Sequence, residues 1–128
     1  MRLILLIAAA GAAGAVGRYL LGGWTYRLLG DSFPYGTLAV NMLGCFLLGT
    51  VQQLGQQTDL LTQETRVAIA IGLLGALTTY STFGYETFRL VEDGRWQPAL
   101  ANIAAHLLLG LFAIWLGITL VRAGMGGG

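Results

Sequence analysis

Four long apolar stretches dominate this sequence and restrict it to very few folds. At about 1.5 Å per residue, an α-helix needs about 20 residues to cross about 30 Å of hydrocarbon. Each stretch approaches or exceeds this length; they run from about Leu3 to Gly22, Thr37 to Leu54, Val67 to Val91 and Ala99 to Val121. Only 10% of the residues are charged, whereas about 25% are charged in a soluble domain. We therefore predict an all-α membrane protein in which residues 1–128 form a single domain of four transmembrane helices.

The two ends of the chain carry signals of their own. Met1–Ala10 is similar to the start of a secretory signal peptide, but the apolar run continues to Leu21 and further spans follow. We therefore expect a retained first helix rather than a cleaved leader. The glycine-rich tail, Gly124–Gly128, is expected to lack regular structure.

Small residues recur along the first apolar stretch, at Gly11, Gly14 and Gly17. Small faces let two helix backbones approach closely in a membrane, so we expect this helix to pack tightly against a partner. The single cysteine, Cys45, is expected to pack as a small apolar residue.

The arginines are nearly balanced between the two sides of the membrane. Three fall on the side of the N-terminus and three on the opposite side, with Arg18 nearer the opposite side; they are Arg2, Arg66 and Arg122, then Arg27, Arg89 and Arg95. Orientation normally follows an excess of Lys and Arg in cytoplasmic loops, and this chain has no lysine. A chain with so little bias can insert both ways. We hypothesise dual topology and an antiparallel homodimer, although so small a set of charges can also balance by chance.

The third apolar stretch contains a run of hydroxyl-bearing residues, Thr78–Thr82, between Gly75 and Gly84. Threonine and glycine add little helical preference, so we predict a break near the middle of this span. Non-helical backbone at bilayer depth is tolerated only where protein covers it or where it lines a polar cavity. There, carbonyl oxygens can hold a cation, and hydroxyl and amide hydrogens can face an anion. The alternative is that the hydroxyl groups only join helices by hydrogen bonds.

Three other polar residues fall within or near the spans, and each has two interpretations. The amide of Asn41 either bonds across helices or faces a wet pathway. His106, with Asn102 one turn before it, is either hydrogen-bonded to a neighbouring helix or a donor beside a groove. Glu86 is a functional residue if it is embedded, and a solvated charge near Arg89 if it lies at the interface.

Several classes of function find no support in the sequence. Nucleophile–base pairs, paired carboxylates and phosphate-binding loops are absent, so we do not expect an enzyme. No basic stripe is present to bind nucleic acid, and the spacing supports no metal cluster at His106. By contrast, Tyr80 and Phe83 lie beside the hydroxyl run, where the partly positive edge of an aromatic ring can meet a small anion.

Three segments together resemble the CrcB/Fluc family of fluoride channels. The most specific is Gly72–Phe83, GLLGALTTYSTF, which contains that family's TTxSTF element. Gly36–Gly44, GTLAVNMLG, is similar to the family's second-helix motif, and Gly14–Tyr19, GAVGRY, is similar to its first-helix motif. The resemblance extends over all four predicted helices. It implies a fluoride-selective channel that lets F⁻ leave the cytoplasm passively across the bacterial inner (plasma) membrane and so confers fluoride resistance.

The resemblance also implies an assembly and a set of site residues. The channel would be an antiparallel, dual-topology homodimer with two pores and a central structural Na⁺ held by the backbone carbonyls of Gly75 and Thr78. The anion pathway would be lined by amide, aromatic, hydroxyl and imidazole side chains, namely Asn41, Phe83, Tyr80, Ser81, Thr82, His106 and Thr37. Arg18 matches a family arginine at the vestibule or in the dimer structure. The family has phenylalanine at the position of Tyr80, whose hydroxyl would donate to the ion or narrow the path.

Two rival functions are weighed against the channel. A proton-coupled transporter of the small multidrug resistance type is also short, four-helical and dual-topology. It needs an embedded carboxylate in its first helix, and residues 3–22 contain none. A non-transporting assembly subunit would use the hydroxyl run and Asn41 only to join helices.

Overall fold

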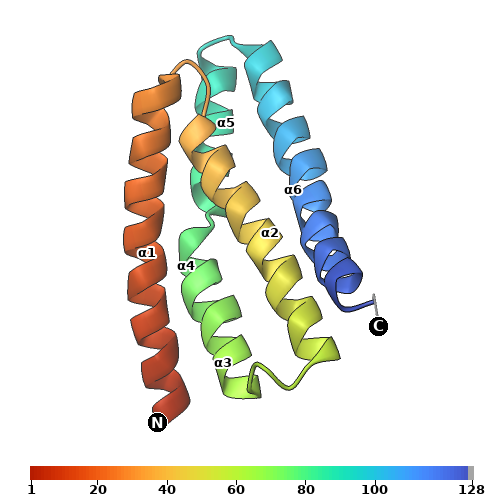
Figure 1. Cartoon of the computed structure of the whole chain (residues 1–128). Helices are drawn as coiled ribbons and strands as arrows, with labels where there is room; N and C mark the ends of the chain where they lie inside the picture. The colour runs from red at the N-terminus through yellow and green to blue at the C-terminus, as the bar shows by residue number, and fades with distance from the viewer. Residues whose placement is uncertain (127–128) are drawn as a thin grey trace.

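The computed structural model describes residues 1–126, which fold as a bundle of helices (Figure 1). Four helical segments are long and apolar enough to cross a membrane. They are α1 (Arg2–Leu29), α2 (Tyr35–Gln57), a composite third segment (Gln63–Glu92) and α6 (Trp96–Met125). The start of α1 and the end of α6 lie at the same end of the bundle (Figure 1). The predicted all-α membrane fold with four spans is confirmed.

The third span is built from four pieces instead of one continuous helix. A short α3 (Gln63–Val67) leads into a π-helical segment, η1 (Ala68–Leu74), and then into the single turn of α4 (Gly75–Leu77). After the extended residues Thr78 and Thr79, the chain resumes as α5 (Tyr80–Glu92). In Figure 1 the interruption is visible between α4 and α5, about halfway along the bundle. The predicted break in the third span is confirmed.

The helices are longer than the apolar stretches from which they were predicted. The first helix runs seven residues beyond Gly22, to Leu29, where Gly30 adopts a φ of 80° that favours glycine. The last helix continues to Met125, and the amide of Gly126 donates to the Arg122 carbonyl at 2.7 Å. The expectation of an irregular tail is therefore wrong for Gly124 and Met125, and Gly127 and Gly128 lie outside the described residues.

Glycines set the distance between packed helices. A Cβ added at Gly14 of α1 would overlap the Leu73 carbonyl of η1, and one at Gly72 would meet the carbonyl of Ile7 at 2.7 Å. The backbones of α1 and the third span are therefore in direct contact, as the small residues of the first stretch predict. The same arrangement joins α2 to α6, where a Cβ at Gly49 would meet the carbonyl of Ile114 at 2.5 Å. These close contacts pair α1 with the third span and α2 with α6.

The outward faces of the bundle are apolar. On α1 the exposed side chains include Leu5, Val16 and Leu20, and on α6 they include Leu107 and Leu111. Apolar surface of this extent is what hydrocarbon requires of a spanning helix. The chain is a multi-pass membrane protein, and several of its polar side chains are buried inside the bundle.

Candidate functional site

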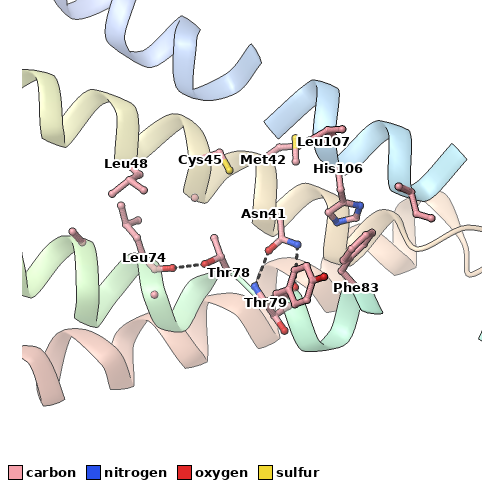
Figure 2. A pocket seen from close by; sticks show the side chains of 15 residues that line it. Asn41, Met42, Cys45, Leu48, Leu74, Thr78, Thr79, Phe83, His106 and Leu107 are labelled. Atoms are coloured by element: carbon pink, nitrogen blue, oxygen red, sulfur yellow. Dashed lines mark hydrogen bonds between the residues drawn. The ribbon is translucent and has the colours of Figure 1, made fainter. Parts of the chain in front are cut away.

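A side chain from α2 stabilises the non-helical backbone at the break in the third span. Thr78 and Thr79 have extended backbones, with ψ of 157° at Thr78 and φ of −151° at Thr79. The Asn41 amide bonds to both backbone groups of Thr79: its Oδ1 accepts from Thr79 N at 2.7 Å, and its Nδ2 donates to Thr79 O at 3.1 Å (Figure 2). Asn41 and Thr79 are both buried. One Nδ2 hydrogen of Asn41 is left over, because an amide has two donors.

The break releases the carbonyls of residues 75–78, which a continuous helix would have used, and hydrogen bonds show where the amides meant for two of them go. In an α-helix each carbonyl accepts the amide four residues later, so Gly75 would accept from Thr79, and Thr78 from Thr82. Here the Thr79 amide donates to Asn41, and the Thr82 amide donates to the Thr79 hydroxyl at 3.2 Å. Gly75 and Thr78 are therefore free to offer their backbone oxygens to a ligand. Carbonyl oxygens of this kind suit a hard cation.

The hydroxyl run forms the N-terminal cap of α5. Thr79 Oγ1 accepts the Thr82 amide, lies 2.8 Å from Thr82 Oγ1 and lies 3.4 Å from Ser81 Oγ. Threonine is favoured at an N-cap because its hydroxyl oxygen accepts one of the unpaired amides of the first turn. The N-terminus of a helix carries partial positive charge. The break thus presents both freed carbonyls and the positive end of a helix at the same depth.

A pocket of about 540 Å³ opens beside the break. Figure 2 shows Asn41, Thr78, Thr79, Phe83 and His106 gathered at one side of it, with apolar side chains such as Leu48 and Leu107 around them. The Phe83 ring lies 4.3 Å from the His106 imidazole and 5.6 Å from the Tyr80 ring, between ring centroids. Tyr80 lines the pocket but is 84% exposed. One wall of the site is therefore not covered by this chain and is exposed at its surface.

Polar side chains of α6 form hydrogen bonds within that helix and to α5. His106 Nδ1 lies 3.0 Å from the Asn102 carbonyl, and the Asn102 amide donates to Thr87 Oγ1 at 2.8 Å. Asn102 is fully buried, and His106 Nε2 is buried without a hydrogen-bond partner among the described residues. The hydrogen bond of His106 is therefore made within its own helix, to the Asn102 carbonyl one turn earlier, and not to a neighbouring helix.

Glu86 lies within the bundle, bonded to two hydroxyl groups. Its Oε1 accepts from Tyr26 at 2.8 Å and from Thr37 at 2.9 Å. Arg89 bonds instead to Glu92, at 3.1 Å. Glu86 is therefore engaged with α1 and α2 rather than with the arginine three residues on, which favours the embedded interpretation over the solvated one.

The structure brings six of the ten predicted site residues together in one pocket wall, and four lie outside it. Gly75 and Thr78 join Asn41, Tyr80, Phe83 and His106 in the pocket wall, whereas Ser81 and Thr82 sit in the cap just outside it. Thr37 is buried and gives its hydroxyl hydrogen to Glu86, so that hydrogen does not face the pocket. Arg18 lies half-buried on α1, away from both pockets, and forms no ion pair within residues 1–126.

Sequence reasoning missed the contributions of Thr79 and Tyr26. Thr79 is both the cap of α5 and the residue that Asn41 grips, and its place in the hydroxyl run was the only signal. Tyr26 lies beyond the end of the first predicted span, and its bond to Glu86 joins residues 60 positions apart. Nothing in the local sequence around either residue indicates such a partner.

A helix broken at mid-membrane, with freed carbonyls, a helix N-terminus and aromatic edges around one pocket, defines a polytopic membrane protein of the ion-conducting class. The chain belongs to the CrcB family: residues 5–118 match the family described as "CrcB-like protein, Camphor Resistance (CrcB)". This confirms the family resemblance found in the sequence.

Curated relatives match this chain over nearly its whole length. The fluoride-specific ion channel FluC of Geobacter metallireducens is 50% identical over 122 residues, which cover 95% of this chain and 98% of that protein. The protein of the same name from Pelobacter propionicus is 42% identical over 128 residues, which cover 100% of this chain and 99% of that protein. These relatives are channels and not enzymes, in agreement with the lack of catalytic motifs.

Proposed function

We propose that this chain forms a fluoride-selective channel that lets F⁻ leave the cytoplasm passively across the bacterial inner membrane and so protects the cell from fluoride. The observation that carries the proposal is the break at Thr78–Thr79, where Asn41 and Phe83 converge beside the N-terminus of α5. The chain is related over nearly all of its length to proteins named as fluoride-specific channels. The negative-inside membrane potential drives the anion outward.

The pathway has to replace the water around a small, strongly hydrated anion with protein donors. Candidate donors lie in sequence along α5 and its neighbours: the spare Asn41 hydrogen, the hydroxyls of Ser81 and Thr82, and the ring edges of Phe83 and Tyr80. His106 packs against Phe83, with the two rings tilted by 41°, and completes the wall on the side of α6. None of these groups is a full positive charge, so fluoride is held weakly enough to leave.

A second copy of the chain, in the opposite orientation, completes the site. The 540 Å³ pocket contains non-helical backbone and an exposed Tyr80, and in a membrane such groups must be covered by protein or water. The arginine balance allows both orientations, so an antiparallel homodimer satisfies both observations. We place Arg18 in the vestibule or in the support of this dimer, and Thr37 at the edge of the pathway through its bond to Glu86.

A structural Na⁺ fits between the two copies. The carbonyls of Gly75 and Thr78 are two of those that the break releases, and two from each copy give four hard oxygen ligands. Among residues 1–126 no group of three His, Cys, Asp or Glu competes as a metal site. When bound, the ion supplies a fixed positive charge at the centre of the pair.

Fluoride efflux from proteoliposomes tests the function. Purified protein is reconstituted with KF inside, and release is followed with a fluoride electrode after addition of a potassium ionophore. We expect rapid F⁻ release that needs the ionophore, and negligible release in a parallel experiment with KCl. Vesicles that contain intact dimers but release no F⁻ would contradict the channel and favour a transporter or an assembly subunit.

The Phe83→Ile substitution distinguishes a role of Phe83 in the anion pathway from a role in helix packing and assembly. We expect Phe83→Ile to lower fluoride efflux about tenfold or more, because an aliphatic chain lacks the positive edge of an aromatic ring, while the dimer persists in size-exclusion chromatography. Phe88→Ile is the matched control, since Phe88 is on the same helix, 61% exposed and outside the pocket. Loss of the dimer with Phe83→Ile would indicate that this residue is needed for assembly.

A further inference from the structure

Tyr26 is the only α1 side chain that hydrogen-bonds to α5 within the described part of the chain. Its hydroxyl donates to Glu86 Oε1 at 2.8 Å, and Thr37 of α2 donates to the same oxygen at 2.9 Å. Three of the four spans therefore meet at one carboxylate oxygen. The other oxygen, Glu86 Oε2, is buried and has no hydrogen-bond partner within residues 1–126.

The start of α2 is shaped to admit the Tyr26 ring. A Cβ added at Gly36 would overlap ring atoms Cε2 and Cδ2 of Tyr26 and would also meet the Gly22 carbonyl. Glycine at this position lets the ring lie flat across α2 and extend to α5. Next to it, Thr37 is only 4% exposed. The position of the Tyr26 hydroxyl is thus fixed by close packing.

Glu86 stands between two pockets. Phe83, one turn earlier on α5, lines the 540 Å³ pocket at the break, whereas Glu86 and Tyr26 line a second pocket of about 500 Å³. The second pocket is walled by Asp31–Pro34 of the α1–α2 loop and by Arg89 and Asp93. It therefore opens at the end of the bundle, and an anion that moves along α5 from Phe83 to this end passes Glu86.

We propose that Tyr26 is a positioning residue for conduction, which holds the Glu86 carboxylate against α1 and α2 and so keeps its negative charge out of the anion path. The inference rests on the proposed fluoride function. A carboxylate that is free to rotate toward the path repels fluoride at short range, where little water screens the charge. Two hydroxyl donors on Oε1 oppose that rotation, since hydrogen bonds to an ionised acceptor are stronger than neutral ones.

A double-mutant cycle tests whether Tyr26 acts through Glu86. We expect Tyr26→Phe, which removes the hydroxyl and keeps the ring, to slow fluoride efflux about three- to tenfold, with the dimer and the thermal stability in detergent retained. In a Glu86→Gln background the same change should alter efflux less than twofold, because no charge remains to be held away. Such coupling is the signature of residues that act through each other, and a purely structural role would slow both backgrounds equally.

Tyr19→Phe is the matched control, because Tyr19 is on the same helix, 80% exposed and without a hydrogen bond to Glu86; its efflux should equal that of the unmodified chain. If the unmodified chain conducts fluoride and Tyr26→Phe conducts equally well, the positioning role is wrong and the channel function stands. Equal slowing by Tyr26→Phe in both backgrounds also overturns it. If the unmodified chain conducts no fluoride, the proposed function fails first and the role of Tyr26 falls with it.

Discussion

Asn41→Leu is expected to lower fluoride efflux at least a hundredfold. Leucine has nearly the shape of asparagine but cannot bond to Thr79, so the substitution leaves the buried Thr79 N–H unpaired. It also removes one of two bonds to the Thr79 carbonyl, which as the N-cap carbonyl of α5 accepts the first backbone bond of that helix as well. An unpaired buried N–H costs about 1–3 kcal/mol and a lost hydrogen bond about 1 kcal/mol, and about 1.4 kcal/mol corresponds to a tenfold change in a population. Together the two losses favour a conformation in which the break closes or moves, and the freed carbonyls and the donors near Phe83 lose their alignment.

The measurement is efflux from proteoliposomes at matched protein content. Gln56→Leu makes the same amide-to-leucine change at an exposed position near the end of α2 and should leave efflux unchanged. If efflux for Asn41→Leu stays within threefold of that for the unmodified chain, the break does not depend on the two hydrogen bonds between Asn41 and Thr79. The Asn41 contribution would then be limited to its spare hydrogen.

Gly14→Val is expected to prevent stable folding. Even the first carbon of a valine side chain at Gly14 would occupy the space of the Leu73 carbonyl and contact Ala76. These neighbours are backbone or short side chains that cannot rotate away, so α1 must separate from the third span. Overpacking of this kind costs about 3 kcal/mol or more, and it moves the wall that carries the break.

Gly23→Val on the same helix is the control, because a Cβ at Gly23 meets nothing within 4 Å and the change in helix propensity is the same. The yield of monodisperse protein and the midpoint of thermal aggregation in detergent should fall for Gly14→Val and stay near the original values for Gly23→Val. Equal behaviour of the two variants would contradict the close backbone contact.

The parts of this molecule that follow from local pattern were accessible from the sequence. Span length and apolar composition gave the four helices, the small residues around Gly14 indicated a close contact, and the hydroxyl run with Gly75 marked the break. Each of these signals lies within one helix, so it can be read without knowing what that helix touches.

The partners of the polar groups were not accessible, because they depend on how distant segments meet. Asn41 and Thr79 are 38 residues apart, and Thr37 and Glu86 are 49 apart. The sequence left Asn41 as either a structural bond or a pathway donor, and the fold shows the structural bond, with one amide hydrogen left over. Tyr26 illustrates the limit most clearly, since its position depends on a glycine in α2 and an acid in α5.

The even number of crossings has a consequence for joining two copies into one polypeptide. The start of α1 and the end of α6 lie at the same end of the bundle (Figure 1). In the proposed antiparallel pair, the end of α6 in one copy and the start of α1 in the next therefore face opposite aqueous compartments, separated by about 30 Å of hydrocarbon. A flexible soluble linker would force the second copy into the wrong orientation. A working tandem fusion thus requires an added hydrophobic helix between the two halves, so that the joined polypeptide crosses the bilayer an odd number of times.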